Sequence, residues 1–373
     1  MIKTFYRRVV LVVLVFCALA SSAQAANQHV TQNVIMVMTD GLRWQEVFRG
    51  AEASLMTKDF KVKDEAAFRK MYWRETPEAR REALMPFLWA TVAKHGQIYG
   101  NRDKGSDAYV TNQFFFSYPG YSETLCGFAD PRVNSNDNVL NPNVTVFEWL
   151  NKKAEFHGKV AGFGAWGIFP SIINSNRAGV PVVAGFDPLT TLPGNPRVDL
   201  LNHLKLETPQ IWDQEPFDVI PFYTALEYLK ERKPRVLYIS LGETDEWAHG
   251  RDYGNYLGAA HRVDEYLRVL WETVQSMSQY QGKTTLIFSP DHGRGEGAKW
   301  TDHGTEVPSS KYIWMAFMGP DTPSLGERSH ASPVTQSQIA ATLAGFLGED
   351  YDADVPKAGK PVVDALRRMS FSR

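Results

Sequence analysis

The stretch Asn33-Val-Ile-Met-Val-Met-Thr-Asp-Gly41 decides the fold. Residues 33–38 form an apolar run, which Thr39-Asp40-Gly41 ends with polar and turn-forming residues. A short apolar run bounded by turn signals is typical of a strand buried on both faces of a sheet. This stretch therefore predicts a buried strand with the carboxylate of Asp40 at its carboxyl end.

Strand and helix patterns alternate along the rest of the chain. Further apolar runs predict strands at residues 159–163, 235–241, 284–289 and 312–318. Helical patterns lie at residues 82–94, 144–154, 224–231, 256–278 and 336–347. This alternation predicts an α/β fold, a three-layer α/β/α sandwich with a mostly parallel central sheet. Residues 170–216 are rich in Pro, Gly and Asn, so we expect long surface loops there beside the site.

The N-terminus has the features of a signal peptide. A basic start is followed by an apolar run over residues 9–20 and by the small-residue pattern Ala23-Gln24-Ala25. The apolar run is shorter than the roughly 20 residues that a membrane-spanning helix needs. We therefore expect a signal peptide over residues 1–25, cleaved after Ala25, and no stable membrane anchor afterwards. Residues 26–373 are then expected to form a single α/β domain that is periplasmic or secreted.

Composition narrows the class of protein. The chain has 373 residues, of which 43% are hydrophobic and 12% aromatic, which excludes a disordered, collagen-like or disulfide-stapled chain. Its formal net charge of −2 gives no expectation of a nucleic-acid-binding surface, because such a surface needs clustered positive charge. Removal of the predicted signal peptide leaves Cys126 as a single cysteine, so no internal disulfide can form.

Metal-binding side chains follow three of the predicted strands. They are Asp40, Asp245, His249, Asp291, His292 and His303. In parallel sheets, ligands bind outside the carboxyl ends of the strands, so we expect these side chains to converge. Asp245 and His249 are one helical turn apart and share a helix face. Mixed histidine and carboxylate ligands suit zinc, with manganese as the competing choice.

A nucleophile candidate lies in Phe116-Ser-Tyr-Pro-Gly-Tyr-Ser-Glu-Thr-Leu-Cys-Gly127. Pro119 suits the start of a helix and Gly127 its end, which places Ser117 near the helix N-terminus. Exposed amides and the helix dipole there would stabilise an alkoxide and an incoming anion, and a metal would lower the pKa of the hydroxyl further. The alternatives are that Ser117 only caps the helix, or that Ser122 is the nucleophile.

The ordered motifs resemble a known two-metal core. Asp40 with its neighbours, Ser117-x-Pro119, Asp245-x-x-x-His249, Asp291-His292-Gly293 and Thr301-Asp302-His303 are together similar to the alkaline phosphatase superfamily. The first half is most similar to nucleotide pyrophosphatase/phosphodiesterases. The C-terminal metal motif is more similar to phosphopentomutase and cofactor-independent phosphoglycerate mutase.

The resemblance implies roles for individual residues. One divalent ion would be held by Asp245, His249 and His303. The second would be held by Asp40, Asp291, His292 and the Ser117 oxygen. Ser117 would attack phosphorus to give a phosphoserine, and Asn138 would donate a hydrogen bond to a nonbridging oxygen. The family has a glycine ten residues beyond its nucleophile. Gly127 satisfies this for Ser117, whereas Arg132 stands ten residues beyond Ser122.

The sequence therefore predicts an exported two-metal phosphoric ester hydrolase, a phosphatase or phosphodiesterase, that acts on a small anionic phosphoester. A phosphomutase, a phosphoryl transferase and a non-catalytic metal-binding protein remain alternatives. A serine-type sulfatase would need Arg where Tyr121 stands. Arg43 and Arg132 are looser candidates for anion contacts, with structural ion pairs as the alternative. Asp264 and Glu265 are expected on a solvated helix face.

Overall fold

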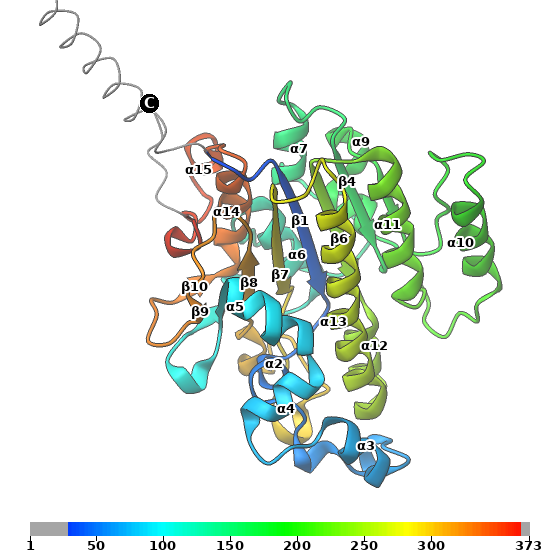
Figure 1. Ribbon diagram of the computed structural model, residues 1–373, viewed down its shortest axis with the longest axis vertical. Coiled ribbons are helices and arrows are strands. Elements are labelled where there is room, and N and C mark those ends of the chain that lie inside the picture. The colour runs from blue at the N-terminus through cyan, green and yellow to red at the C-terminus, as the bar shows by residue number, and fades with distance from the viewer. Residues whose placement is uncertain (1–28, 367–373) are drawn as a thin grey trace, which may run out of the picture.

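An eight-stranded sheet lies at the centre of the computed structural model, which describes residues 29–366 (Figure 1). The strand order is β5-β4-β6-β1-β7-β8-β2-β9. The strands are β1 (Asn33–Thr39), β2 (Gly96–Tyr99), β4 (Val160–Gly164), β5 (Val182–Ala184), β6 (Val236–Leu241), β7 (Thr284–Pro290), β8 (Met315–Met318) and β9 (Gly326–Glu327). Only β8 runs antiparallel to its neighbours, so the predicted mostly parallel sheet is confirmed. The predicted signal peptide lies outside the described residues.

Helices surround this sheet. A second, two-stranded sheet pairs β3 (Ala108–Tyr109) with β10 (Val334–Thr335). The helices are α2 (Trp44–Arg49), α3 (Glu65–Tyr72), α4 (Pro77–Leu84), α5 (Ala93–His95), α6 (Ser117–Cys126), α7 (Val146–Asn151), α8 (Phe169–Ile173), α9 (Ser175–Ala178), α10 (Pro196–Glu207), α11 (Val219–Arg232), α12 (Glu243–His249), α13 (Tyr253–Ser276), α14 (Ile339–Phe346) and α15 (Tyr351–Asp354). Within residues 29–366, no helix is both long and apolar enough to cross a membrane.

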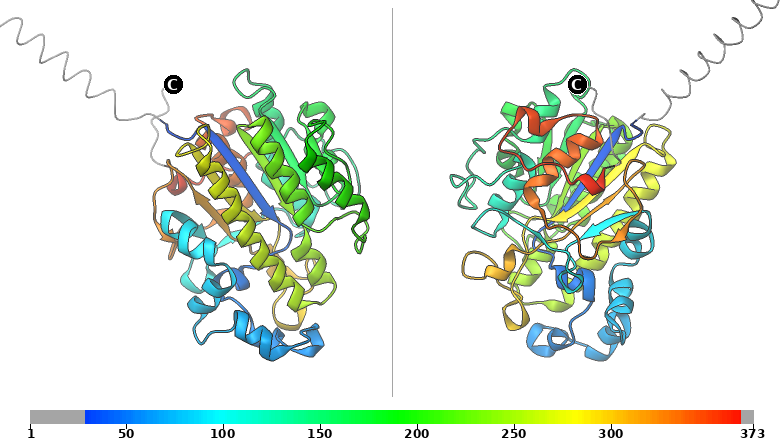
Figure 2. Two further views of the ribbon diagram at one scale, coloured as in Figure 1. Left: turned by 45° about the vertical axis from the view of Figure 1, so that its right-hand side comes forward. Right: turned by 90° about the vertical axis from the view of Figure 1, so that its left-hand side faces the viewer.

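The alternation of side chains along β1 separates two apolar cores. Ile35 and Val37 are buried in one core with residues of α11 and α13. Val34, Met36 and Met38 are buried in the other core with residues of α6, α7 and α14. Successive side chains of a strand point to opposite faces, so a fully apolar strand must be covered twice. Figures 1 and 2 show α11 and α13 on one face and α14 on the other, which confirms the three-layer architecture.

The expected long loops over residues 170–216 are largely wrong. This region contains β5, α10 and two short helices. Asn195 caps α10 by accepting hydrogen bonds from the backbone N–H groups of Arg197 and Val198, and Pro196 is the first helical residue. Asn and Pro at these two positions are helix-start signals as well as loop signals, so composition alone misreads them.

The helix expected over residues 82–94 is interrupted. Helix α4 ends at Leu84, residues 88–92 form a π-helical turn, and α5 covers three residues. The carboxylate of Asp264 lies at this break and accepts hydrogen bonds from the backbone N–H groups of Phe87 and Leu88, both at 2.7 Å. Asp264 is buried, so the solvated position predicted for it is wrong, whereas Glu265 pairs with Arg268 on the surface as expected. Burial raises the pKa of Asp264 to about 7, against the effect of these two N–H donors.

We expect Asp264→Ala to lower the free energy of unfolding by about 2 kcal/mol, because it leaves two buried N–H donors without a partner. The matched control is the exposed neighbour, and Glu265→Gln should change the free energy by less than about 0.5 kcal/mol. Urea unfolding of both variants measures the difference. Equal losses would show that the Asp264 contacts contribute nothing particular.

Asp321 attaches the first described residues to the domain. Its carboxylate accepts hydrogen bonds from the backbone N–H groups of Val30 and Thr31, and it contacts the His29 ring at 2.9 Å. Burial alone would raise the pKa of Asp321, but the hydrogen bonds from His29 and Thr31 outweigh it and lower the pKa to about 2. The charged form is therefore the one that stabilises the fold.

A carboxylate with a lowered pKa stabilises the fold above its ordinary pKa, and this contribution is lost as the pH falls towards the folded value. We expect Asp321→Asn to be less stable than the wild type at pH 6, with the difference shrinking between pH 4 and pH 2. Denaturant unfolding at a series of pH values measures it. Asp364→Asn, which removes an exposed partner of Arg328, is the control. A difference that stays constant with pH would contradict the assignment.

Candidate metal centre

The pairing of three parallel strands places the first carboxylates together. Strand β1 lies between β6 and β7, with Thr39 opposite Leu241 of β6 and opposite Pro290 of β7. Asp40 and Asp291 are the next residues of β1 and β7, so both emerge at the same edge. The Asp291 carboxylate accepts a hydrogen bond from the backbone N–H of Gly41 at 3.0 Å. The expected convergence at the strand ends is therefore present.

Six side chains form two groups of potential metal ligands. One group is fully buried and consists of Asp40, Asp291 and His292. The other is more accessible and consists of Asp245, His249 and His303. Within each group, one ligand atom per residue lies within 4.8 Å of the others. These are the two sets that the resemblance implied.

Backbone contacts orient the imidazoles towards the centre. Nδ1 of His292 lies 2.8 Å from the Gly293 carbonyl, and Nδ1 of His303 lies 3.2 Å from the Phe115 carbonyl. Each contact leaves Nε2 free to face the ligand groups, as is usual for metal-binding histidines. Nε2 of His303 is 3.1 Å from Nε2 of His249. Two imidazole nitrogens that point at each other suit a shared cation.

The electrostatics of the buried group also call for a cation. Oδ2 of Asp291 is buried without a hydrogen-bond partner. Burial and the neighbouring Asp40 carboxylate raise the pKa of Asp291 well above its usual range. Burial lowers the pKa of His292, but the Asp291 and Asp40 carboxylates outweigh it and raise that pKa to about 9. Burial, together with its charged neighbours, lowers the pKa of His303 far enough to keep its imidazole neutral. These residues fit divalent ions.

Ser117 lies directly against the buried group. It is the first residue of α6, and its Oγ is 3.4 Å from Oδ1 of Asp40 and 3.4 Å from Nε2 of His292. Helix α6 ends at Gly127 with φ 80°, as the sequence predicts. Gly120, three residues after Ser117 in the same helix, lies very close to the backbone of Asp291. A Cβ at position 120 would lie 2.4 Å from the Asp291 carbonyl oxygen. The hydroxyl thus sits at a helix N-terminus beside potential metal ligands.

Ser122, the competing nucleophile, points elsewhere. Its Oγ accepts a hydrogen bond from Nδ2 of Asn141 at 3.1 Å and lies 3.9 Å from the Cys126 sulfur. Both neighbours are buried, and neither belongs to a ligand group. The geometry therefore favours Ser117 for the role of nucleophile.

The structure does not bring the other candidates into contact with Ser117. Asn138 is exposed, and its Oδ1 accepts a hydrogen bond from Ser171 at 2.6 Å, so its role in holding a phosphoryl group stays a prediction. The asparagine that contacts the start of α6 is Asn136, whose Oδ1 accepts a hydrogen bond from the backbone N–H of Tyr118 at 2.9 Å. The looser candidates are in ion pairs, Arg43 with Glu46 and Glu52, and Arg132 with Asp130.

Two further residues contact the centre and were not predicted. Tyr121 donates a hydrogen bond to Oδ2 of Asp40 at 3.0 Å. The buried guanidinium of Arg294 contacts the Asp245 carboxylate and donates to the Thr301 carbonyl at 2.6 Å. Burial lowers the pKa of Arg294 to about 9. Arg294 follows the Asp291-His292-Gly293 motif directly, so its position in the sequence was the available signal.

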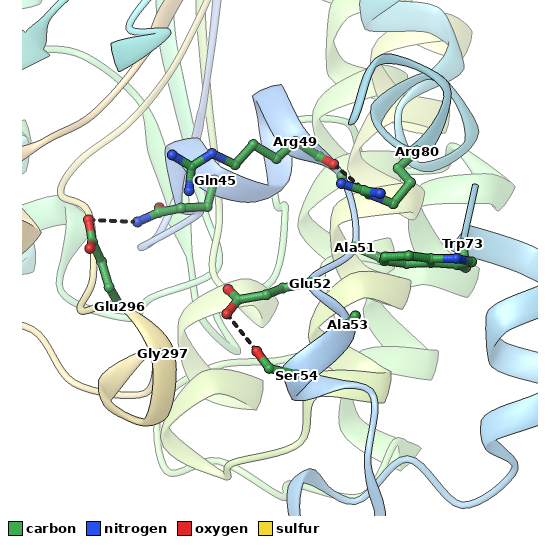
Figure 3. Close-up of a pocket in the computed structure, with 11 residues that line it drawn as sticks. Gln45, Arg49, Ala51, Glu52, Ala53, Ser54, Trp73, Arg80, Glu296 and Gly297 are labelled. Carbon is green, nitrogen blue, oxygen red and sulfur yellow. Dashed lines mark hydrogen bonds between the residues drawn. The ribbon is translucent and has the colours of Figure 1, made fainter. Parts of the chain in front are cut away.

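A cavity of about 520 Å³ lies beside α2 and α4 (Figure 3). The charged side chains that line it make hydrogen bonds to other groups of the protein. Glu52 accepts a hydrogen bond from Ser54 at 2.8 Å, and Arg80 donates to the Arg49 carbonyl at 3.1 Å. No member of either ligand group lines it. The cavity is therefore distinct from the metal centre.

Comparison with solved structures identifies the fold. Alkaline phosphatase PafA is 10% identical to this chain with a TM-score of 0.59, and the match covers 90% of this chain and 99% of that one. A protein in the alkaline phosphatase superfamily from Vibrio parahaemolyticus is 14% identical with a TM-score of 0.51, over 91% and 72% of the two chains. The 2-O GAG sulfatase BT1596 is 13% identical with a TM-score of 0.54, over 92% and 76%.

The chain has the fold of the alkaline phosphatase superfamily. The resemblance that the ordered motifs indicated is confirmed at the level of the fold. No protein-family model matches the chain, and no curated protein matches it in sequence.

We expect added Zn²⁺ or Mn²⁺ to raise the melting temperature and EDTA to lower it, because an ion that binds only the folded chain stabilises it by about 2.7 kcal/mol at a hundredfold excess over Kd. His249→Ala should weaken the binding of one ion at least about tenfold. His203→Ala is the matched control, since His203 is an exposed histidine on α10. Thermal unfolding and elemental analysis measure both effects. A melting temperature insensitive to EDTA, with no bound metal, would contradict the assignment.

Proposed function

We propose that the protein is an exported two-metal phosphoric ester hydrolase that acts through Ser117. The observation that carries this proposal is the position of Ser117 Oγ, 3.4 Å from Asp40 and 3.4 Å from His292 at the first residue of α6. Plain metal binding does not require a hydroxyl at this point. The export part of the proposal rests on the signal peptide predicted over residues 1–25.

The residues of the two groups have separable tasks. Asp40, Asp291 and His292 would hold one ion beside Ser117, and the second group would hold the other. Two such ions stabilise the attacking and leaving oxygens of an in-line displacement. Zinc, with manganese as the alternative, suits these ligands.

Ser117 then supplies the nucleophile. Its Oγ forms a bond to phosphorus while the bond from phosphorus to the leaving oxygen breaks. The proton lost by the hydroxyl is balanced by the one that the leaving oxygen takes up as it departs as the alcohol. Water next breaks the phosphoserine bond, which restores the hydroxyl and releases the phosphate product. The N-terminus of α6 favours the negative charge of both the alkoxide and the ester. Asn138 would donate a hydrogen bond to a nonbridging oxygen.

Tyr121 favours phosphate over sulfate esters. A serine-type sulfatase needs an arginine at this position, four residues beyond the nucleophile. Here the Tyr121 hydroxyl donates to Asp40 and accepts a hydrogen bond from Ser240 at 3.0 Å, so the position is used to fix a ligand carboxylate. The neighbouring structures include both a phosphatase and a sulfatase, so this contrast must be tested directly.

We expect Ser117→Ala to reduce turnover more than about a thousandfold, because it removes the attacking oxygen. Ser122→Ala should keep turnover within a few fold, since Ser122 faces Asn141. The assays use p-nitrophenyl phosphate, bis-p-nitrophenyl phosphate and p-nitrophenyl sulfate with added zinc or manganese. Loss of turnover in Ser122→Ala but not in Ser117→Ala would reverse the assignment.

The same assays separate the alternatives. A phosphomutase would isomerise a sugar phosphate without release of inorganic phosphate, and a phosphoryl transferase would need an added alcohol. A non-catalytic metal-binding protein would bind zinc but hydrolyse neither phosphate ester. Wild-type activity on the sulfate ester alone would replace the phosphoester proposal.

A further inference from the structure

The segment between α10 and α11 carries a carboxyl group to the edge of the metal centre. Glu215 lies against Gly242, the first residue after β6, and near Ala165, the first residue after β4. A Cβ at position 242 would lie 1.8 Å from Oε2 of Glu215. Glycine at this position is what leaves room for the carboxyl group.

Several contacts hold this segment in place. The Gln214 carbonyl accepts a hydrogen bond from the backbone N–H of Gly167 at 3.2 Å. On either side of Glu215 in the sequence, Trp212 and Phe217 pack together with ring centroids 5.1 Å apart. Trp212 also packs against Trp247 of α12 at 4.9 Å. Glu215 is therefore on an anchored segment.

No group in the described part of the chain satisfies this carboxyl. Oε2 of Glu215 is buried without a hydrogen-bond partner, and no salt bridge reaches Glu215 from residues 29–366. Burial raises its pKa well above the usual range, and the negative charges of Asp40 and Glu246 raise it further. A buried carboxyl without a cation thus lies at the edge of the candidate metal centre.

The arginines around the centre are committed to other carboxylates. They are Arg43 with Glu46, Arg262 with Glu243 and Arg294 with Asp245. A third metal ion does not fit Glu215 either. Glu215 belongs to no group of three clustered ligands among residues 29–366, and Oδ2 of Asp40 already accepts from Tyr121.

We propose that Glu215 binds an ammonium group on the alcohol portion of the ester, so that the substrate class is phosphoesters of amino alcohols. An ammonium supplies positive charge and, unless fully alkylated, N–H donors to a carboxylate that has neither. An unpaired carboxylate at the edge of the centre disfavours a simple anionic ester but complements one that carries a cation. This inference rests on the proposed hydrolase function. It adds the chemical class of the alcohol portion, whether that alcohol is the leaving group or stays attached to phosphorus.

The test compares two substrates of the same shape. They are p-nitrophenyl phosphorylcholine and p-nitrophenyl 3,3-dimethylbutyl phosphate, an isostere in which a neutral carbon replaces the ammonium nitrogen. For the wild type loaded with zinc, we expect kcat/KM to be at least about tenfold higher for the choline ester. Glu215→Gln should reduce this ratio to about one. Asp213→Asn is the control, since Asp213 is an exposed acidic residue of the same segment, and it should keep the wild-type ratio. An unchanged ratio in Glu215→Gln, or a wild-type ratio near one, would overturn the inference.

A binding measurement separates this inference from the hydrolase proposal. Choline, ethanolamine and 3,3-dimethylbutanol are titrated calorimetrically into the zinc-loaded Ser117→Ala protein. Tighter binding of either amine than of the alcohol, weakened about tenfold by Glu215→Gln, supports the inference even if neither ester is hydrolysed, in which case only the hydrolase proposal fails. Comparison of choline with ethanolamine distinguishes binding of a quaternary ammonium from binding of a primary ammonium. Equal binding of all three compounds would overturn it, as would three bound zinc ions in the wild type and two in Glu215→Gln.

Discussion

The parallel pairing of β6, β1 and β7 is the constraint on which the rest of the structure depends. All three strands end at one edge, and Thr39 lies opposite Leu241 and Pro290 in the pairing. The residues just beyond these positions are metal-ligand candidates. A slip of one residue in the pairing of β1 with β7 would turn every following side chain of the slipped strand to the opposite face, and it would separate Asp40 from Asp291. The register of the apolar core thus determines whether a metal centre exists.

Charge balance distinguishes the metal centre from the surrounding protein. Outside it, buried carboxylates have cationic or N–H partners, as Glu46 has Arg43 and as Asp264 has two backbone N–H donors. Inside it, Asp291 and Glu215 each keep a buried oxygen without a partner. A folded protein rarely leaves buried carboxylate oxygens unsatisfied unless ions or ligands complete them. The same imbalance therefore supports both the metals and a cationic substrate group.

Sequence patterns predict the structure correctly where local signals and tertiary packing agree. The apolar runs that became β1, β6 and β7 are buried on both faces, and such strands need no partner to be recognised. The same patterns give wrong predictions where one residue type is common in two structural settings. Asp264 is a polar residue on a helix, which predicts a position in solvent. Its carboxylate is buried because it accepts hydrogen bonds from Phe87 and Leu88, where a distant helix is interrupted. Short strands such as β5 and β9 carry too few residues to show a pattern.

The sequence by itself determined the class of fold, the nucleophile candidate and the ordered set of candidate metal ligands, because these depend on strand ends, helix ends and fixed spacings. Only the tertiary structure decided which groups lie together and which remain unpaired. It separated Ser117 from Ser122 by the face of α6 on which each lies. It also brought Glu215 to Gly242 from a segment whose composition predicts loops. Such contacts join residues far apart in the chain, and no local pattern encodes the distance between them.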